Sequence, residues 1–140
     1  MVQRRQYLDK LIKLRDTKLI KVVTGVRRCG KSTLLKQFEE SLKEAGVAER
    51  QILSLNFEDL ENEPLLDFKK LYKYVKERLI QGKTTYVFLD EIQRVEDFQK
   101  AVDSLFIQDN VDVYITGSNA HMLSGELATL LSGRYVEIRM

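Results

Sequence analysis

The sequence predicts an α/β fold: a three-layer sandwich in which a parallel five-stranded sheet carries helices on both faces. Hydrophobic periodicity alternates between strand-like and helix-like segments along most of the 140 residues. The connecting segments are long enough for helical crossovers, which join parallel strands with a right-handed turn. One strand candidate, 86–89, is almost wholly apolar, and this is typical of a strand that is buried on both faces.

The first half of the chain contains three predicted helices and two predicted strands. Apolar residues recur at helical spacing in 3–16, which predicts an amphipathic helix. Residues 19–24 are rich in β-branched side chains and predict a strand that runs into a glycine turn, and 52–57 predicts a second strand. Between them, 34–46 has helical spacing and ends at a glycine. Pro64–Gly82 predicts a third helix, because the fixed φ and missing N–H of proline suit the first helical position.

The second half continues the alternation. The apolar segment 86–89 is the third strand, and 98–105 has the spacing of a helix. Residues 111–116 predict the fourth strand, 122–131 a further helix, and 135–138 the start of a fifth strand. The chain shows no repeat, linker or low-complexity segment, so it is predicted to be one domain.

Composition excludes several classes of protein. Hydrophobic residues are 44% and charged residues 31% of the chain, which is typical of a globular protein and not of a disordered one. No apolar stretch reaches the length of a membrane helix, and the polar N-terminus does not resemble a secretory signal. A single cysteine, Cys29, excludes an internal disulfide and favours a cytoplasmic location. With one histidine, His121, no structural zinc site is expected.

The net charge of +2 is unevenly distributed. Residues 1–36 hold eleven Lys or Arg and two acidic residues, whereas 37–63 hold two basic and eight acidic residues. The basic first quarter is compatible with an anionic partner such as nucleic acid. A solvated helix face is the favoured interpretation, because the whole chain is far from the strongly basic balance expected of a dedicated nucleic-acid-binding protein.

The segment 25–32, GVRRCGKS, fits the Walker A pattern G-x-x-x-x-G-K-[ST] at every fixed position. Glycines let the backbone wrap so that its N–H groups point at phosphates, and the following helix adds the positive end of its dipole. Lys31 is expected at the surface of this loop, where it would reach the β- and γ-phosphates, and Ser32 is expected to ligate Mg²⁺. The predicted nucleotide-binding residues are Gly25, Val26, Arg27, Arg28, Cys29, Gly30, Lys31, Ser32 and Thr33.

The variable positions of this loop have open roles. Arg27 and Arg28 either contact phosphates or a neighbouring subunit, or are merely solvated. For Cys29, the favoured interpretation is a side chain that the loop merely tolerates, and the alternative is an oxidation-sensitive thiol.

Two acidic residues follow the apolar third strand, in the position of a Walker B motif. The carboxyl ends of parallel strands meet at one edge of a sheet, and open α/β sheets bind their ligands there. Asp90 is therefore predicted to hold the magnesium ion opposite Ser32. Glu91 is predicted to activate the water that attacks the γ-phosphate.

The fourth strand also ends in polar residues. Ser118 and Asn119 are expected near the same edge, where either could bind the γ-phosphate or the attacking water. Asn119 is favoured over Ser118 because an amide donates and accepts hydrogen bonds at once. The alternative is an ordinary turn or helix cap.

Together, GVRRCGKS at 25–32, LDEIQ at 89–93 and ITGSNA at 115–120 resemble the AAA+ branch of P-loop ATPases. More narrowly, they are similar to a prokaryotic family of predicted AAA-type ATPases whose full chains carry a C-terminal domain of poorly defined function. The resemblance implies a sheet of order 5-1-4-3-2 that binds Mg-ATP at its carboxyl edge. It also implies that 1–140 is an AAA+ core that ends before the helical lid.

The resemblance assigns roles to two further residues. Arg134 lies before the fifth strand, where AAA+ proteins often carry an arginine finger that acts across the interface of a homo-oligomer. A surface charge is the alternative for Arg134. Tyr7 is either an apolar wall of the adenine site or a core residue of its helix.

The function predicted from these residues is Mg-dependent ATP binding and hydrolysis that drives a conformational switch on a protein or DNA target. A nucleotide-gated nucleic-acid-binding module and a small-molecule kinase are the alternatives; for the kinase, neither an arginine-bearing lid nor an acceptor pocket is identified. A GTPase is disfavoured because ITGSN stands where a guanine-reading N-K-x-D motif would be expected.

Overall fold

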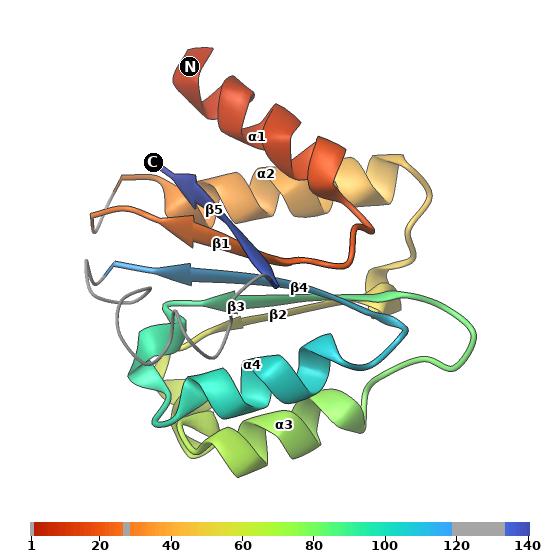
Figure 1. The fold of residues 1–140 in the computed structure, drawn as a ribbon, viewed down its shortest axis with the longest axis vertical. Coiled ribbons are helices and arrows are strands. Elements are labelled where there is room, and N and C mark those ends of the chain that lie inside the picture. Colours follow the sequence, from red (N-terminus) through yellow and green to blue (C-terminus); the bar gives the residue numbers. More distant parts are fainter. Residues whose placement is uncertain (1, 27–28, 119–133) are drawn as a thin grey trace.

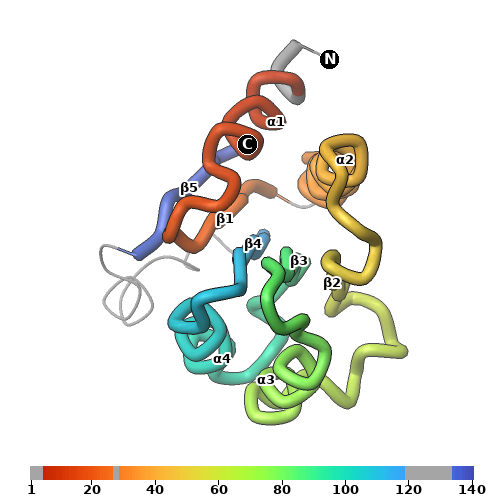
Figure 2. The backbone as a smooth tube through the Cα atoms, turned by 90° about the vertical axis from the view of Figure 1, so that its right-hand side faces the viewer, coloured from red at the N-terminus to blue at the C-terminus, as the bar shows by residue number. Residues whose placement is uncertain are grey.

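A computed structural model describes residues 2–26, 29–118 and 134–140 of the chain. Its sheet lies between two helical layers, as Figures 1 and 2 show. Helices α1 (Val2–Leu14) and α2 (Lys31–Glu44) cover one face, and α3 (Phe68–Lys76) and α4 (Phe98–Phe106) cover the other. Among the described residues, no helix is long and apolar enough to cross a membrane.

The sheet has five parallel strands in the order β2-β3-β4-β1-β5. The same order read from the other edge is 5-1-4-3-2, so the predicted topology is confirmed. The strands are β1 (Ile20–Thr24), β2 (Ile52–Asn56), β3 (Thr85–Asp90), β4 (Val111–Gly117) and β5 (Tyr135–Arg139). Because all five run the same way, the ends of β1, β3 and β4 lie at one edge and their beginnings at the opposite edge.

Alternating side chains of the central strands build a core on each face of the sheet. In β3, Tyr86 and Phe88 pack in the cluster that also holds the apolar residues of α1 and α2. Val87 and Leu89 pack in the other cluster, against α3 and α4. Every residue of β3 and β4 is buried, as expected for central strands covered on both sides.

A buried polar network lies where β1, β3 and β4 begin. We call it the hinge cluster, because it joins the turn after α1 to the sheet; its members are Arg15, Asp16, Lys21, Tyr86, Asp112 and Tyr114. Lys21 Nζ lies 2.5 Å from Asp112 Oδ1, and both side chains are almost completely buried. The other carboxylate oxygen of Asp112 accepts hydrogen bonds from the Tyr114 hydroxyl at 2.7 Å and the Asp16 N–H at 2.9 Å.

Burial shifts the pKa values of two members of this network, Lys21 and Tyr114. It lowers the pKa of Lys21, an effect that the charge of Asp112 partly opposes. Burial, with a further contribution from the negative charge of Asp112, raises the pKa of Tyr114 well above its ordinary value.

The helix predicted over Pro64–Gly82 was wrong at both ends. Pro64 lies in a short 3₁₀ helix, η2 (Leu60–Leu65), and α3 begins only at Phe68. The Asp67 carboxylate accepts the N–H of Lys69 and so caps the start of α3. The carbonyl of Leu66 is used by the N–H of Glu96, which ties this point to the start of α4 instead of to a continuous helix.

Two short 3₁₀ helices, η1 (Glu49–Gln51) and η3 (Ile92–Arg94), were not predicted. The helix predicted over 122–131 lies outside the described residues.

Candidate nucleotide-binding site

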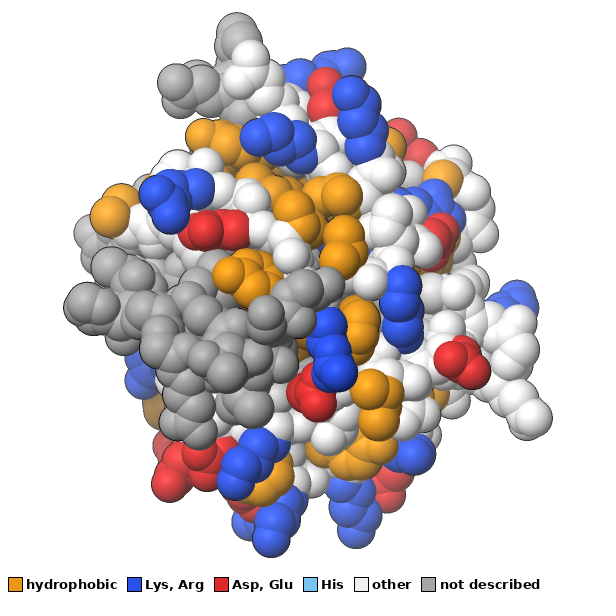
Figure 3. Space-filling model, viewed as in Figure 1, with side chains coloured by type: hydrophobic (Ala, Val, Ile, Leu, Met, Phe, Trp, Pro, Cys, Tyr) orange, Lys and Arg blue, Asp and Glu red, His pale blue; other side chains and the backbone are white. Residues whose placement is uncertain are grey.

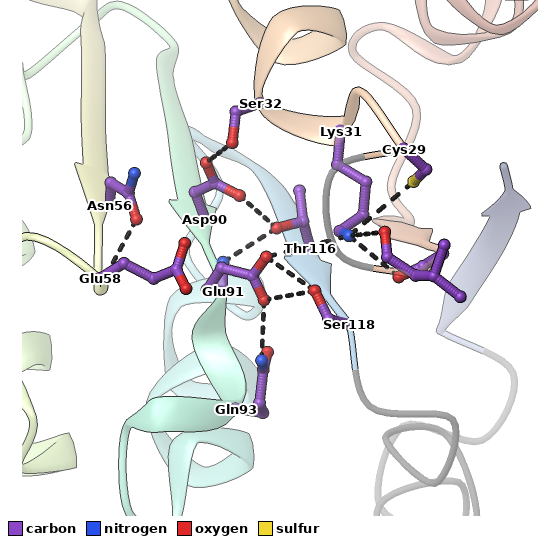
Figure 4. A network of polar contacts seen from close by, with 12 residues as sticks. Cys29, Lys31, Ser32, Asn56, Glu58, Asp90, Glu91, Gln93, Thr116 and Ser118 are labelled. Carbon is purple, nitrogen blue, oxygen red and sulfur yellow. Dashed lines mark hydrogen bonds and ion pairs between the residues drawn. The ribbon is translucent and has the colours of Figure 1, made fainter.

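The predicted site residues come from three neighbouring strand ends. The loop that follows β1 carries Lys31 and Ser32, the end of β3 carries Asp90 and Glu91, and the end of β4 carries Thr116 and Ser118. Figure 4 shows their polar groups turned toward one another. This is the carboxyl edge of the sheet, where the sequence placed the site.

Lys31 is the first residue of α2, and only 3% of its surface is exposed. Its ammonium group donates hydrogen bonds to the carbonyl oxygens of Gly25 and Val26, each at 2.9 Å. Glu91 Oε2 lies 3.9 Å away. The expectation that Lys31 lies at the loop surface was therefore wrong, because the loop wraps around the ammonium group and covers it.

Glycine is needed at two positions of this loop. Gly30 has φ +102°, a left-handed conformation that side chains disfavour, and it precedes α2 without any side-chain cap. A Cβ atom at Gly25 would lie 2.7 Å from Cys29 Sγ and 3.3 Å from the Met140 Cβ. The close wrapping leaves the first N–H groups of α2 without a side-chain cap, the arrangement of an anion site.

Ser32 and Asp90 join the loop to β3. Ser32 Oγ donates to Asp90 Oδ2 at 2.5 Å, and the Thr116 hydroxyl donates to Asp90 Oδ1 at 2.5 Å. The carboxylate is 6% exposed, whereas Ser32 lies at the surface. A hydroxyl and a carboxylate side by side are hard oxygen donors, which fit a Mg²⁺ ion that completes its shell with phosphates and water.

Glu91 has a strained backbone, and its carboxylate accepts hydrogen bonds from two side chains. Its φ of 57° and ψ of 50° are left-handed, which is uncommon for a residue other than glycine. Its N–H donates to Thr116 Oγ1 at 2.9 Å. The Ser118 hydroxyl lies 2.9 and 2.8 Å from the two carboxylate oxygens, and Gln93 Nε2 donates to Oε1 at 2.8 Å.

Thr116 and Gln93 were missed by the sequence analysis. The Thr116 hydroxyl, completely buried, accepts from the Glu91 N–H and donates to Asp90, so one side chain positions both acids. The position of Thr116 could have indicated this role. It is the last residue but one of a central parallel strand, where a buried hydroxyl can bond to polar groups at the ends of the neighbouring strands. Gln93 gave no comparable signal.

The remaining predicted residues have no side chain in these contacts or lie outside the described residues. Val26 is 73% exposed and takes part only through the carbonyl that accepts from Lys31, and Thr33 is exposed on the first turn of α2. Tyr7 is partly buried against the core cluster of α1 and α2. The predictions for Arg27, Arg28 and Asn119 lie outside the described residues.

Arg134 is not brought together with the other site residues. It directly precedes β5 and therefore lies at the edge of the sheet opposite to the phosphate loop. Its Nη1 lies 2.6 Å from Asp103 Oδ1 of α4, an ion pair that is about half exposed.

Two curated relatives have similar sequences. An uncharacterized protein of Haemophilus influenzae is 49% identical over 141 residues, covering 100% of this chain and 35% of the relative. An uncharacterized protein of Methanocaldococcus jannaschii is 37% identical over 129 residues, covering 90% of this chain and 27% of the relative. The chain thus spans about a third or less of the length of the curated relatives that it matches.

A solved structure has the same fold. The Drosophila ORC, in a structure bound to AT-rich DNA and Cdc6, matches with a TM-score of 0.68 at 15% identity, covering 98% of this chain and 53% of that chain. The AAA domain family model matches residues 17–140. The chain therefore belongs to the AAA domain family, and its sheet and helices form an AAA+ P-loop ATPase core.

Proposed function

We propose that this chain binds ATP together with Mg²⁺, hydrolyses it, and uses the cycle to switch conformation. The observation that carries the proposal is that a buried lysine, a hydroxyl–carboxylate pair and a strained glutamate converge at one edge of a parallel sheet. Family membership supports nucleotide-dependent activity. The remaining steps rest on the chemistry of the individual residues.

Lys31 is the proposed phosphate-binding residue. Its ammonium group is held by two neutral carbonyl oxygens, which are weaker partners than phosphate oxygens. ATP would replace these carbonyls, and the loop N–H groups with the first turn of α2 would bind the remaining phosphate oxygens. Gly25, Gly30 and Cys29 form the loop around them, and the preference for ATP over GTP rests on the missing guanine-reading motif.

Ser32 and Asp90 are the proposed magnesium residues. The ion would supply charge neutralisation between the β- and γ-phosphates. Ser32 would ligate the ion through an oxygen lone pair, which its present hydrogen bond leaves free because the hydroxyl donates its proton to Asp90. Thr116 would keep Asp90 oriented through the other carboxylate oxygen.

Glu91 is the proposed general base. Its carboxylate is at present hydrogen bonded to Ser118 and Gln93, and both groups are donors to it. Exchange of the Ser118 hydrogen bond for one from water would direct the carboxylate at the attacking water. We propose that Ser118, together with Asn119, responds to the γ-phosphate and so couples its presence to the release of Glu91.

Arg134 would act on a neighbouring copy, because its own site lies at the other edge of the sheet. Breaking the ion pair with Asp103 would free the guanidinium for that role. We propose that the target of the switch is recognised by segments of the longer relatives that this chain does not span.

The test is Glu91→Gln in a chain of the full length of the curated relatives, because weak or no turnover is expected of the 140-residue core alone. ATP binding and phosphate release are measured on the same preparation. The amide keeps the shape of the side chain but cannot act as a base, so turnover should fall about 10²–10⁴-fold while ATP affinity is retained. Glu96→Gln, a change of the same type at an exposed position nearby, should leave both unchanged. Turnover at the wild-type rate in Glu91→Gln would contradict the assignment of the base, and loss of ATP binding would move Glu91 to the metal site or the fold.

A further inference from the structure

The outer face of α3 carries an unusual density of positive charge. Residues 68–83 contain six Lys or Arg and one acidic residue, Glu77. The net charge of the second half of the chain does not show this local excess of positive charge, because acidic residues outside 68–83 balance it. We call the exposed cations of this region the α3 basic face; they are Lys69, Lys70, Lys73, Lys76 and Arg78, with Lys100 of α4 beside them.

Helical geometry places the lysines together. Lys69, Lys73 and Lys76 follow the spacing i, i+4, i+7, so they lie along one line on the side opposite to buried Leu71 and Val75. Within the part of the chain that the structure describes, no carboxylate lies within 4.0 Å of any cation of the α3 basic face, although other surface cations are paired. These charges are therefore available to a partner.

Aromatic rings lie beside several of these cations, and Tyr72 and Tyr74 are only partly buried against the core. The Arg78 guanidinium stacks 3.4 Å from the centre of the Tyr74 ring and donates to the Tyr74 carbonyl at 2.9 Å. The Lys76 ammonium lies 5.6 Å from the Tyr72 ring centre on the other flank of the helix. Near the start of α3, Lys69 and Lys100 both lie within 6 Å of the Phe68 ring centre.

Four acidic residues lie near the beginning of α3. They line a groove of about 580 Å³ where α3 and α4 start, together with two cations of the α3 basic face; the acidic residues are Glu63, Asp67, Glu96 and Asp97, and the cations are Lys69 and Lys70. The lower part of Figure 3, where α3 lies in Figure 1, shows several blue side chains beside orange ones, with red ones among them and at the left. The α3 basic face therefore extends along the whole helix, and acidic residues lie beside its first turn.

We propose that the α3 basic face binds single-stranded nucleic acid. A row of unpaired cations at helical spacing is complementary to a chain of phosphates. Partly exposed tyrosines and a stacked arginine add planar surfaces on which bases can stack, which is typical of single-strand binding. Such surfaces would not strengthen the binding of an acidic protein, which has no bases to stack on them. The site is independent of the phosphate loop, so its failure and that of the ATP proposal are distinguishable.

The test measures fluorescence anisotropy of a labelled oligothymidine with the 140-residue chain over a range of salt concentrations. The variant Lys70→Gln/Lys73→Gln/Lys76→Gln should lose at least about tenfold in affinity. Its slope of log K against log salt should fall by about 2, since each lost phosphate contact on a single strand contributes about 0.7. Thermal unfolding should be unchanged, because these side chains are exposed.

A matched control removes the same charge elsewhere. Lys10→Gln/Lys13→Gln/Lys36→Gln alters three exposed lysines of α1 and α2, in the basic first quarter of the sequence. It should retain most of the affinity. Equal losses in the two triple variants, or a larger loss in the control, would overturn the proposal, as would the absence of binding by the wild-type chain.

Two further measurements separate stacking from charge. Arg78→Lys keeps the charge but removes the planar platform, so it should weaken oligothymidine binding more than duplex binding. Polyglutamate should compete poorly with oligothymidine. Stronger binding of duplex or of polyglutamate than of oligothymidine would contradict a single-strand site.

Discussion

Two buried polar clusters lie at opposite ends of the same three strands. At the beginning of β1, β3 and β4, the hinge cluster pairs Lys21 with Asp112 directly, at 2.5 Å. At the other end, Lys31 is equally buried, yet its nearest partners are two loop carbonyls, and the glutamate lies 3.9 Å away. The same type of residue is thus completely paired at one edge and only provisionally paired at the other.

This difference distinguishes the buried residues that stabilise the fold from those that are available to bind a ligand. Lys21 and Asp112 both lie within regular strands, so a shift of the backbone at either residue would disrupt hydrogen bonds of the sheet. Lys31 and Ser32 begin a helix after a glycine loop, and exchanging their partners disturbs no strand. We infer that the hinge cluster serves stability and that the phosphate-loop residues serve a ligand.

The largest expected effect lies in the hinge cluster. Asp112→Ala would leave the Lys21 ammonium buried without its counter-ion, which costs about 3–5 kcal/mol of the free energy of unfolding. Urea denaturation measures it. The double variant Lys21→Met/Asp112→Leu should recover most of the loss, because no ion is then buried alone. A double variant as unstable as Asp112→Ala would show that the hydrogen bonds of Asp112 with Tyr114 and Asp16, and not the pairing of charges, decide stability at this site.

A smaller effect is expected at the rim of the same cluster. The Tyr86 hydroxyl donates to Asp16 at 2.8 Å and accepts from Arg15 at 3.2 Å. Tyr86 is buried, whereas the side chains of Arg15 and Asp16 are partly exposed to water. Tyr86→Phe should lower the free energy of unfolding by about 1 kcal/mol, the net value of a typical hydrogen bond. The nucleotide-induced shift in Tm should not change. A changed nucleotide shift would mean that the two clusters are coupled through β3.

The smallest effect on stability is expected at the phosphate loop. Ser32→Ala removes a hydrogen bond whose donor is exposed, so the free energy of unfolding should fall by at most about 1 kcal/mol. The same variant should lose the dependence of ATP binding on Mg²⁺, which a titration with and without magnesium detects. Normal magnesium dependence would remove Ser32 from the proposed metal site.

Sequence reasoning worked where one strong pattern acted alone. The wholly apolar β3 and the alternation of strands and helices predicted the parallel sheet, and GVRRCGKS predicted where the loop lies. The extent of α3 could not be predicted, because its start depends on the contact between Leu66 and Glu96 rather than on Pro64. Local propensity favours a helix start at a proline, and a tertiary contact overrides it.

The contacts of polar residues inside strands were harder to predict. Lys21 and Asp112 interrupt apolar runs, but only the strand order places β1 beside β4 and brings the two charges together. The role of Thr116 likewise depends on the register between β3 and β4. The burial of Lys31 depends on how the loop closes, which motif spacing does not describe.

The most direct test of the separation is ATP-induced stabilisation of the wild-type chain and of Lys31→Ala, measured with Mg²⁺ at a hundredfold excess over Kd. The wild type should gain about 2.7 kcal/mol. Lys31→Ala should lose this gain, while its stability without nucleotide falls by only about 1 kcal/mol, because Ser118 and Gln93 still satisfy Glu91. If Lys31→Ala unfolds as readily as Asp112→Ala, or is stabilised by ATP as much as the wild type, Lys31 is a structural residue and the account is contradicted.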